Sequence, residues 1–324
     1  MTTLMKEALG TLEIKGRKAL ETAKRQLLLD KTESEKLWQA LEYYAKNWED
    51  TLHSGMLAVA CEAVGGNAEE SLCMQVAMLF STAAIDIHDD IIDGSRIKNG
   101  KYTVFGKFGK NITLLIGDGI MIKGMIMLNK CGRKFSTRTM EAIVSTIETA
   151  LTEAGIAHVL ELGLRGKISL TPEKYLYVLN KKASILEAHT RIGALIGRGT
   201  QSEIEALGEF GRILGTLIIV RDEFIDVFEA QELKDRMKNG CLPLPMLYAF
   251  ENPKAKAKIL NILSKPKIPE EDMELIVDIV FREKKVESFK NEMESLAKKA
   301  SRIASKLANK GQLDLLITAS LEDL

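Results

Sequence analysis

The chain has 324 residues, with 45 lysine and arginine residues against 45 aspartate and glutamate residues, so its formal net charge is zero. This balance argues against a general nucleic-acid-binding surface, which needs a clear excess of basic side chains. No stretch approaches the about 18 consecutive apolar residues of a membrane span, and the N-terminus has no signal-peptide pattern. We therefore expect a soluble, cytoplasmic protein with no transmembrane segment.

The proline distribution and the apolar spacing predict an all-α fold. All six prolines occur at position 172 or later, and apolar residues recur at intervals of three and four. The segments 67–70 and 202–205 have the pattern of capping boxes, which open helices. Thr171 followed by Pro172 is typical of an N-cap and a first helical position.

In the first half of the chain, residues 1–48 are predicted to form two amphipathic helices, whose apolar stripe suits dimer or lid contacts. An apolar helix follows over 57–64 and ends at two glycines. The next helix runs from 68 to about 94. An apolar helical segment then covers 113–127.

In the second half, helices are predicted over 137–164, 172–196 and 202–239, with a helical and increasingly charged remainder. No repeat or linker divides the chain, so residues 1–324 are expected to form one domain. The four cysteines, at 61, 73, 131 and 241, lack the spacing of a metal site. We expect them to be small core residues that stay reduced.

Three carboxylates, Asp89, Asp90 and Asp93, stand at the end of the long apolar run before Gly94. On a helix, Asp89 and Asp93 lie about 40° apart and one turn from each other. Ionised carboxylates this close repel one another unless cations lie between them. Carboxylate oxygens on one helical face suit Mg²⁺, which also accepts phosphate oxygens and water. A solvated helix end is the alternative.

A second acidic cluster, Asp222, Glu223 and Asp226, follows the apolar run 213–220. One such cluster is weak support for a metal site, because acidic residues at helical spacing are common. Two clusters that each end an apolar helix are stronger support, since they could direct two sets of carboxylates into one cavity. The sequence therefore predicts metal ligands at both clusters.

Several basic side chains are candidates for binding a diphosphate bridged to these carboxylates by Mg²⁺. For the group Lys181-Lys182 or the group Arg236 with Lys238 taken alone, a solvated face is the favoured interpretation. The candidates are Arg96, Lys98, Lys101, Lys181, Lys182, Arg236 and Lys238.

With these motifs the chain resembles the trans-isoprenyl diphosphate synthases, or polyprenyl synthetases, and by extension class I terpene synthases. The resemblance rests on the segment 88–93, on Gly100-Lys101 with Thr103, on Gly117-Asp118, on Lys181 and on 222–226 followed by Leu242-Pro243. It implies a single large bundle of long helices around a deep central cavity, usually dimeric.

The same resemblance implies site residues and a cofactor. Asp89 and Asp93 would bind two Mg²⁺ ions and Asp222 a third, with Asp90, Glu223 and Asp226 also among the metal-binding carboxylates. Lys181 would contact the departing diphosphate of an allylic prenyl diphosphate. The other expected substrate-binding residues are Arg96, Lys98, Lys182 and Lys238.

The chain departs from the family where the second substrate, isopentenyl diphosphate, would be held. Members of the family carry a Gly-Gly-Lys-Arg-x-Arg-Pro motif there, whereas positions 48–54 here read Trp-Glu-Asp-Thr-Leu-His-Ser. Thr82 replaces a histidine that is often found at this site, and Lys98-Asn99 replaces an arginine pair. Each lost charge-assisted donor would cost about 1.5–3 kcal/mol of binding free energy.

These losses favour a terpene synthase on a prenyltransferase scaffold, which ionises a C15–C25 allylic diphosphate and then cyclises, deprotonates or hydrates the cation. Asp86, one turn before Asp89 and Asp90, would be a fourth catalytic carboxylate beside Asp89, Asp93 and Asp222, or would simply pair with a nearby donor. Two alternatives stay open. One is a chain-elongating prenyl diphosphate synthase that uses other basic residues, and the other is a non-catalytic subunit of a heteromeric prenyltransferase.

Overall fold

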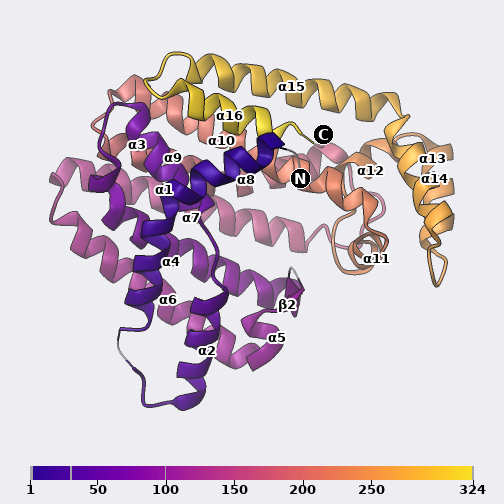
Figure 1. Cartoon of the computed structure of the whole chain (residues 1–324). Coiled ribbons are helices and arrows are strands. Elements are labelled where there is room, and N and C mark those ends of the chain that lie inside the picture. The colour runs from indigo at the N-terminus through magenta and orange to yellow at the C-terminus, as the bar shows by residue number, and fades with distance from the viewer. Residues whose placement is uncertain (1–2, 30, 99, 323–324) are drawn as a thin grey trace. The chain divides into compact units, whose positions relative to one another are not determined.

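The computed structural model describes residues 3–29, 31–98 and 100–322, and Figure 1 shows their helices by label. Apart from one two-residue hairpin, the regular elements of this part are helices, so the all-α prediction is confirmed. The elements are α1 (Thr3–Leu27), α2 (Glu35–Asn47), α3 (Leu52–Ala63), α4 (Ala68–Asp93), β1 (Ile97–Lys98), β2 (Lys101–Tyr102), α5 (Val104–Phe108), α6 (Lys110–Gly132), α7 (Thr137–Leu162), α8 (Pro172–Lys182), α9 (Ser184–Ile196), α10 (Gln201–Ile225), the 3-10 turn η1 (Asp226–Phe228), α11 (Ala230–Asn239), α12 (Leu244–Ala249), α13 (Pro253–Leu263), α14 (Glu270–Phe281), α15 (Lys284–Ala304) and α16 (Lys310–Ser320).

The chain forms two compact units, each built from more than one stretch of sequence. The first comprises Met1–Ala8, Ser145–Ala188 and Glu205–Leu324, and the second comprises Leu9–Val144 and His189–Ile204. We call them the 222-unit and the 89-unit, after the first aspartate of the acidic cluster that each contains. The expectation of one domain stays a prediction.

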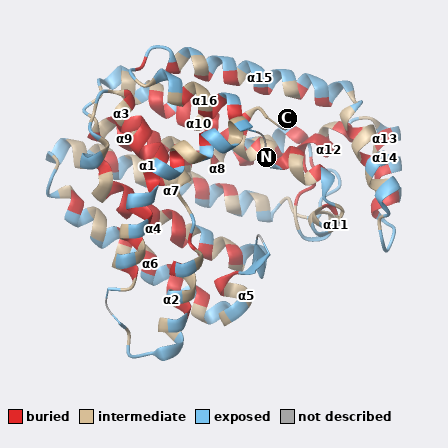
Figure 2. Cartoon of the chain, in the orientation of Figure 1, coloured by how far each residue is buried: buried red, intermediate tan, exposed pale blue. Residues whose placement is uncertain are grey.

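The 89-unit is organised around α4, which packs along α6 and α3 (Figure 1). The apolar half of α4 is buried, as the red colour in Figure 2 shows. Two glycines of α6 allow a close approach, because a Cβ atom at Gly124 would lie 3.2 Å from the Phe80 side chain and one at Gly117 would lie 2.5 Å from His88 Nε2. The helix that carries the first acidic cluster is therefore held firmly by its neighbours.

A disulfide between Cys73 and Cys131 links the beginning of α4 to the end of α6. The expectation that all four cysteines stay reduced is wrong for this pair. The sequence pattern missed it because the two residues are 58 positions apart and meet only when α4 and α6 pack antiparallel. Cys61 and Cys241 are buried free thiols, as expected.

The 222-unit has a core of aromatic side chains on α10, α12, α14 and α15. Phe289 stacks on Phe224 and on Tyr248, with ring centroids 6.0 and 4.6 Å away. α15 and α16 lie side by side, as Figure 1 shows. The second acidic cluster therefore ends a helix whose last turns are anchored by aromatic contacts.

Three predicted boundaries differ from the structure. The helix predicted over 172–196 is divided at Ala183, and the one predicted over 202–239 is interrupted by η1. The capping box at the start of α10 uses Thr200 and Glu203, since the Glu203 carboxylate accepts from the backbone N of Thr200 at 2.7 Å. The box predicted at 202–205 lies two residues too late for this role. Asn67 does cap α4, as predicted.

Two helices, α4 and α6, are long and apolar enough to cross a membrane by length and composition alone. In α4, 67% of the most apolar window is buried, which is the behaviour of a core helix, whereas in α6 only 28% is buried. Figure 2 shows exposed positions along α6. The exposed large apolar side chains of this helix are Leu114, Leu115, Ile122, Met125 and Ile126.

Candidate active site

The first acidic cluster lies on the last turns of α4, where the apolar helix ends. Gly94 closes the helix in the left-handed conformation, with φ of 69°, which favours glycine. Asp93 is exposed and Asp89 is partly buried, while Asp90 is only 5% exposed. The predicted helix end and its carboxylates are therefore where the sequence placed them.

Lys98 on the hairpin reaches back to two carboxylates of α4. Its Nζ lies 2.7 Å from Asp90 Oδ1 and 3.0 Å from Asp86 Oδ1. Burial raises the pKa of Asp90 to about 6, although Lys98 acts in the opposite direction. Burial also acts to lower the pKa of Lys98, but Asp86 and Asp90 outweigh it and raise that pKa. Lys98 is therefore a firmly protonated counter-ion of both carboxylates.

Asp86 and Lys98 line a cavity of about 460 Å³ in the 89-unit. Its wall includes side chains from α2, α4, the hairpin and the segment between α2 and α3. Aromatic residues supply much of the wall, among them Tyr43, Tyr44 and Trp48. Four of the positions at which the chain departs from the isopentenyl-site motif, Trp48, Glu49, Asp50 and His53, also contribute to this wall.

Asp50 and His53 form a partly buried pair in the same cavity. His53 Nδ1 lies 2.8 Å from Asp50 Oδ2, and the His53 backbone N donates to Asp50 Oδ1 at 3.2 Å. Although burial acts in the other direction, the charge and hydrogen bonds of His53 lower the pKa of Asp50 to about 2. Burial likewise opposes the charged form of His53, but Asp50 raises its pKa above 6.5. Thr82 Oγ1 lies 3.4 Å from Asp50 Oδ2, so two of the departures from the family pattern contact each other.

In the 222-unit, Glu223 is buried and held by three donors. Its carboxylate accepts from Tyr175 Oη at 3.1 Å, from Arg236 Nη1 at 2.8 Å and from the Leu244 backbone N at 2.9 Å. Arg236 also pairs with Asp226 and, at 2.9 Å, with Glu232. The solvated-face alternative is therefore wrong for Arg236, which joins the second acidic cluster to α11.

Asp222 remains the exposed carboxylate of the second cluster. Partial desolvation raises the pKa of Asp222, with Arg221 as the main opposing charge, and burial raises the pKa of Asp226 to about 6, opposed by Arg236. In the described part of the chain, no group of three or more His, Cys, Asp or Glu side chains is already arranged to hold a metal ion. A Mg²⁺ ion at either cluster would therefore need phosphate oxygens or water to complete its coordination.

The remaining predicted basic residues lie in varied surroundings. Lys182 Nζ pairs with Glu161 at 2.5 Å, and Lys181 Nζ lies 5.2 Å from the centre of the Tyr177 ring. Arg96 stacks over Phe105 at 4.9 Å, and Lys238 is exposed. Arg96 and Lys98 belong to the 89-unit and the other three to the 222-unit. Asn99 lies outside the described residues.

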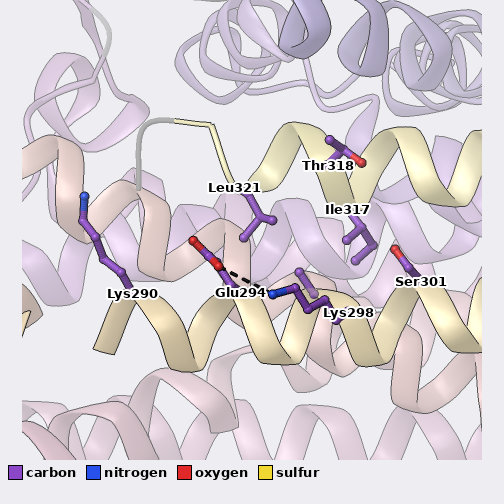
Figure 3. A pocket seen from close by; sticks show the side chains of 8 residues that line it. Lys290, Glu294, Lys298, Ser301, Ile317, Thr318 and Leu321 are labelled. Atoms are coloured by element: carbon purple, nitrogen blue, oxygen red, sulfur yellow. Dashed lines mark ion pairs between the residues drawn. The ribbon is translucent and has the colours of Figure 1, made fainter. Parts of the chain in front are cut away.

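A smaller cavity of about 240 Å³ lies between α15 and α16 (Figure 3). Lys298 and Glu294, which line it, pair with each other at 3.7 Å, as the dashed line in the figure shows. Serine, threonine and apolar side chains complete the wall. None of the predicted site residues lines this groove, so it is separate from the acidic clusters.

Sequence reasoning missed the pairing of Asp50 with His53 and both carboxylate partners of Lys98. It treated both histidine and aspartate at these positions only as replacements for lost cations. It also missed the contact of His88 Nε2 with Asp118, at 3.2 Å, although both residues carry the family resemblance. A signal was available for Asp86 and Asp90, since four residues on a helix bring two side chains together.

The chain is similar to known proteins of one family. Residues 34–280 match the family profile described as polyprenyl synthetase. A geranylgeranyl diphosphate synthase of Methanosarcina mazei is 29% identical over 271 residues, covering 82% of each chain. A short chain isoprenyl diphosphate synthase of Methanothermobacter thermautotrophicus is 26% identical over 238 residues, covering 71% of this chain and 72% of that protein.

The solved structure of a geranylgeranyl pyrophosphate synthetase from Pyrococcus horikoshii has the same fold, with a TM-score of 0.86 and 98% coverage of both chains at 22% identity. The relatives named by these comparisons are chain-elongating synthases. The prediction of a terpene synthase is therefore wrong, and the relatives favour the elongating alternative. The error came from treating missing cations as proof that the second substrate is not bound.

Proposed function

Because the chain belongs to the polyprenyl synthetase family, we propose that it is a prenyltransferase that lengthens an allylic prenyl diphosphate with isopentenyl diphosphate. The observation that carries this proposal is the pair of acidic helix ends, Asp89 with Asp93 on α4 and Asp222 on α10, in a chain that matches the family over both.

Asp89, Asp93 and Asp222 would hold Mg²⁺, whose role when bound is to neutralise the diphosphate that leaves the allylic carbon. Their carboxylate oxygens fit this ion, and the exposure of Asp93 and Asp222 leaves room for phosphate oxygens. Glu223 and Asp226 support the second cluster through Arg236. Asp90 belongs to the first cluster and holds the Lys98 side chain in position through their ion pair.

The cavity beside α4 would take isopentenyl diphosphate. Lys98, Lys101 and protonated His53 line it and are the basic side chains available there for the second diphosphate. These basic side chains are fewer than those of the family motif, so we expect a lower affinity for isopentenyl diphosphate than in relatives that carry the motif. Tyr43, Tyr44 and Trp48 offer apolar surface to the isopentenyl group.

The test is to incubate the purified protein with Mg²⁺, C10–C20 allylic diphosphates and labelled isopentenyl diphosphate, and to separate the products by chain length. We expect labelled diphosphates that are longer by five carbons or multiples of five. Asp89→Asn should lower the rate at least about a hundredfold, whereas Glu69→Gln, on an exposed pair of the same helix, should not. Hydrocarbons or alcohols formed without isopentenyl diphosphate, and no label in the products, would refute the proposal.

We also propose that the chain forms a homodimer through the exposed apolar face of α6. Leu115, Ile122 and Ile126 lie within about 40° of one another on the helix and are 60%, 56% and 49% exposed. Such a contiguous apolar face favours a second copy of the chain as its cover. Light scattering should give twice the chain mass, and Ile122→Glu should give a monomer.

A further inference from the structure

The basic side chains of the 460 Å³ cavity are all neutralised by carboxylates of the same wall. His53 pairs with Asp50, and Lys101 Nζ lies 3.3 Å from Glu49 Oε1. Lys98 holds two carboxylates, as described above. Among the described lining residues there are four carboxylates and three basic side chains, so the cavity offers no uncompensated positive charge to an anion.

Of the two carboxylates that Lys98 holds, Asp86 is the one that lies outside the acidic clusters. It lies one turn before Asp90 on α4, so both carboxylates reach the same ammonium group. Lysine has three N–H donors, and Asp86 and Asp90 occupy two of them. Asp90 is buried beside the helix end, whereas the Asp86 side chain is 60% exposed and can be displaced or removed without leaving a buried charge.

We propose that Asp86 is a specificity-determining residue that competes with the diphosphate of the acceptor substrate for Lys98. This inference rests on the proposed function, in which that diphosphate enters the cavity. The substrate has to displace Asp86 from the ammonium group before it gains the contact, and its own negative charge is repelled while Asp86 stays. Asp86 therefore lowers the affinity of the cavity for anions, so that the diphosphate binds there only at high substrate concentration.

The competition at Lys98 is stronger than at the neighbouring pair. The side chains of Lys101 and Glu49 are 55% and 75% exposed, so water and salt screen their attraction. The Lys98 and Asp86 side chains are less exposed, at 41% and 60%, and the other partner of Lys98, Asp90, is only 7% exposed. Removal of the negative charge at position 86 should therefore change anion affinity more than removal of the charge at position 49.

The experiment measures the affinity of the full-length protein for isopentenyl diphosphate by calorimetry without metal, and the KM for the same substrate with Mg²⁺. Asp86→Asn should lower both the dissociation constant and the KM about tenfold, which corresponds to about 1.4 kcal/mol. Asp86→Leu should give the same gain, and it separates loss of charge from loss of an oxygen acceptor. Glu69→Gln removes one negative charge from an exposed pair at the other end of α4 and should leave both values unchanged.

A double-mutant cycle tests whether the effect acts through Lys98. Lys98→Gln should weaken binding about threefold or less in the unaltered protein, where Lys98 is already engaged. In the Asp86→Asn background the same change should weaken binding about tenfold or more. Additive effects would show that Asp86 acts on the anion independently of Lys98 and would overturn the proposal.

The outcomes for this inference and for the proposed function are distinguishable. Five-carbon elongation with no change of KM or dissociation constant in either Asp86 variant overturns the inference and leaves the proposed function intact. Absence of elongation in all variants, with calorimetric binding of isopentenyl diphosphate also absent, overturns both. Thermal melting of each variant tests whether it is folded. If Asp86→Asn does not fold, Asp86→Leu provides the same test.

Discussion

The disulfide between Cys73 and Cys131 gives a prediction whose size follows from the structure. The bridge closes a loop of 58 residues that contains most of α4, the hairpin, α5 and α6. In the chain-entropy treatment, closing a loop of this length removes about 14 cal/mol/K from the unfolded chain, or about 4 kcal/mol at 25 °C. Reduction should lower the free energy of unfolding of the 89-unit by about this amount.

The assay is urea denaturation of the protein with and without dithiothreitol, followed by circular dichroism. The matched control is the double variant Cys73→Ala/Cys131→Ala, which should resemble the reduced protein and should not respond to dithiothreitol. Thiol titration of the denatured, unreduced protein should find two free thiols, those of Cys61 and Cys241.

Two results would refute this reasoning. One is a count of four free thiols, which would mean that the cysteines are reduced as the sequence pattern suggested. The other is an equal response to dithiothreitol in the double variant, which would assign the effect to something other than the bridge. A loss below about 1 kcal/mol with the bridge present would show that the unfolded chain is already compact around this loop.

Three further predictions concern stability. Arg236→Gln should lower the free energy of unfolding by about 3–5 kcal/mol, because it leaves the buried Glu223 without its charged partner, and adding Glu223→Gln should restore part of the loss in urea denaturation. Because the pKa of His53 is raised, its pair with Asp50 stabilises the fold fully below about pH 6.5, and this stabilisation decreases as the pH rises through the raised pKa. Because the pKa of Asp50 is lowered, the same stabilisation is lost as the pH falls from 3.8 towards 2. The difference in unfolding free energy between the unaltered protein and His53→Gln should therefore be largest between about pH 4 and 6.5 and small at pH 9, and a pH-independent difference would contradict it. Gly193→Ala should lower the melting temperature, since a Cβ atom there would lie 2.3 Å from a backbone oxygen of α3, and an unchanged melting temperature would show that the two helices can separate without cost.

The position of the first acidic cluster could be predicted because it depends on local rules. Apolar spacing, the Asn67 cap and Gly94 bound α4 at the residues where the structure begins and ends it. The partners of its carboxylates could not be predicted in this way. Lys98 reaches Asp86 and Asp90 only because β1 and β2 turn the chain back, and a two-residue hairpin leaves no periodic pattern in the sequence.

The second cluster shows the same limit more clearly. A continuous helix over 202–239 would place Asp226 and Arg236 about 15 Å apart along its axis, with no contact between them. The interruption at η1 redirects α11, so that Arg236 contacts both Asp226 and Glu223. No proline or glycine marks the position of this break in the sequence, so the break depends on tertiary contacts. The charges of a site could thus be identified from the sequence, while their pairing depended on the fold.

This difference between charge and pairing explains the wrong functional prediction. Counting residues at 50, 53 and 82 suggested that the second diphosphate has no site, because cations had been replaced. In the structure those replacements contact one another, and a cavity with three basic side chains remains beside them. Its affinity for an anion then depends on how firmly the wall carboxylates hold these side chains and not on their number. A reduced number of cations is therefore compatible with elongation, provided that a negative charge such as Asp86 can be displaced.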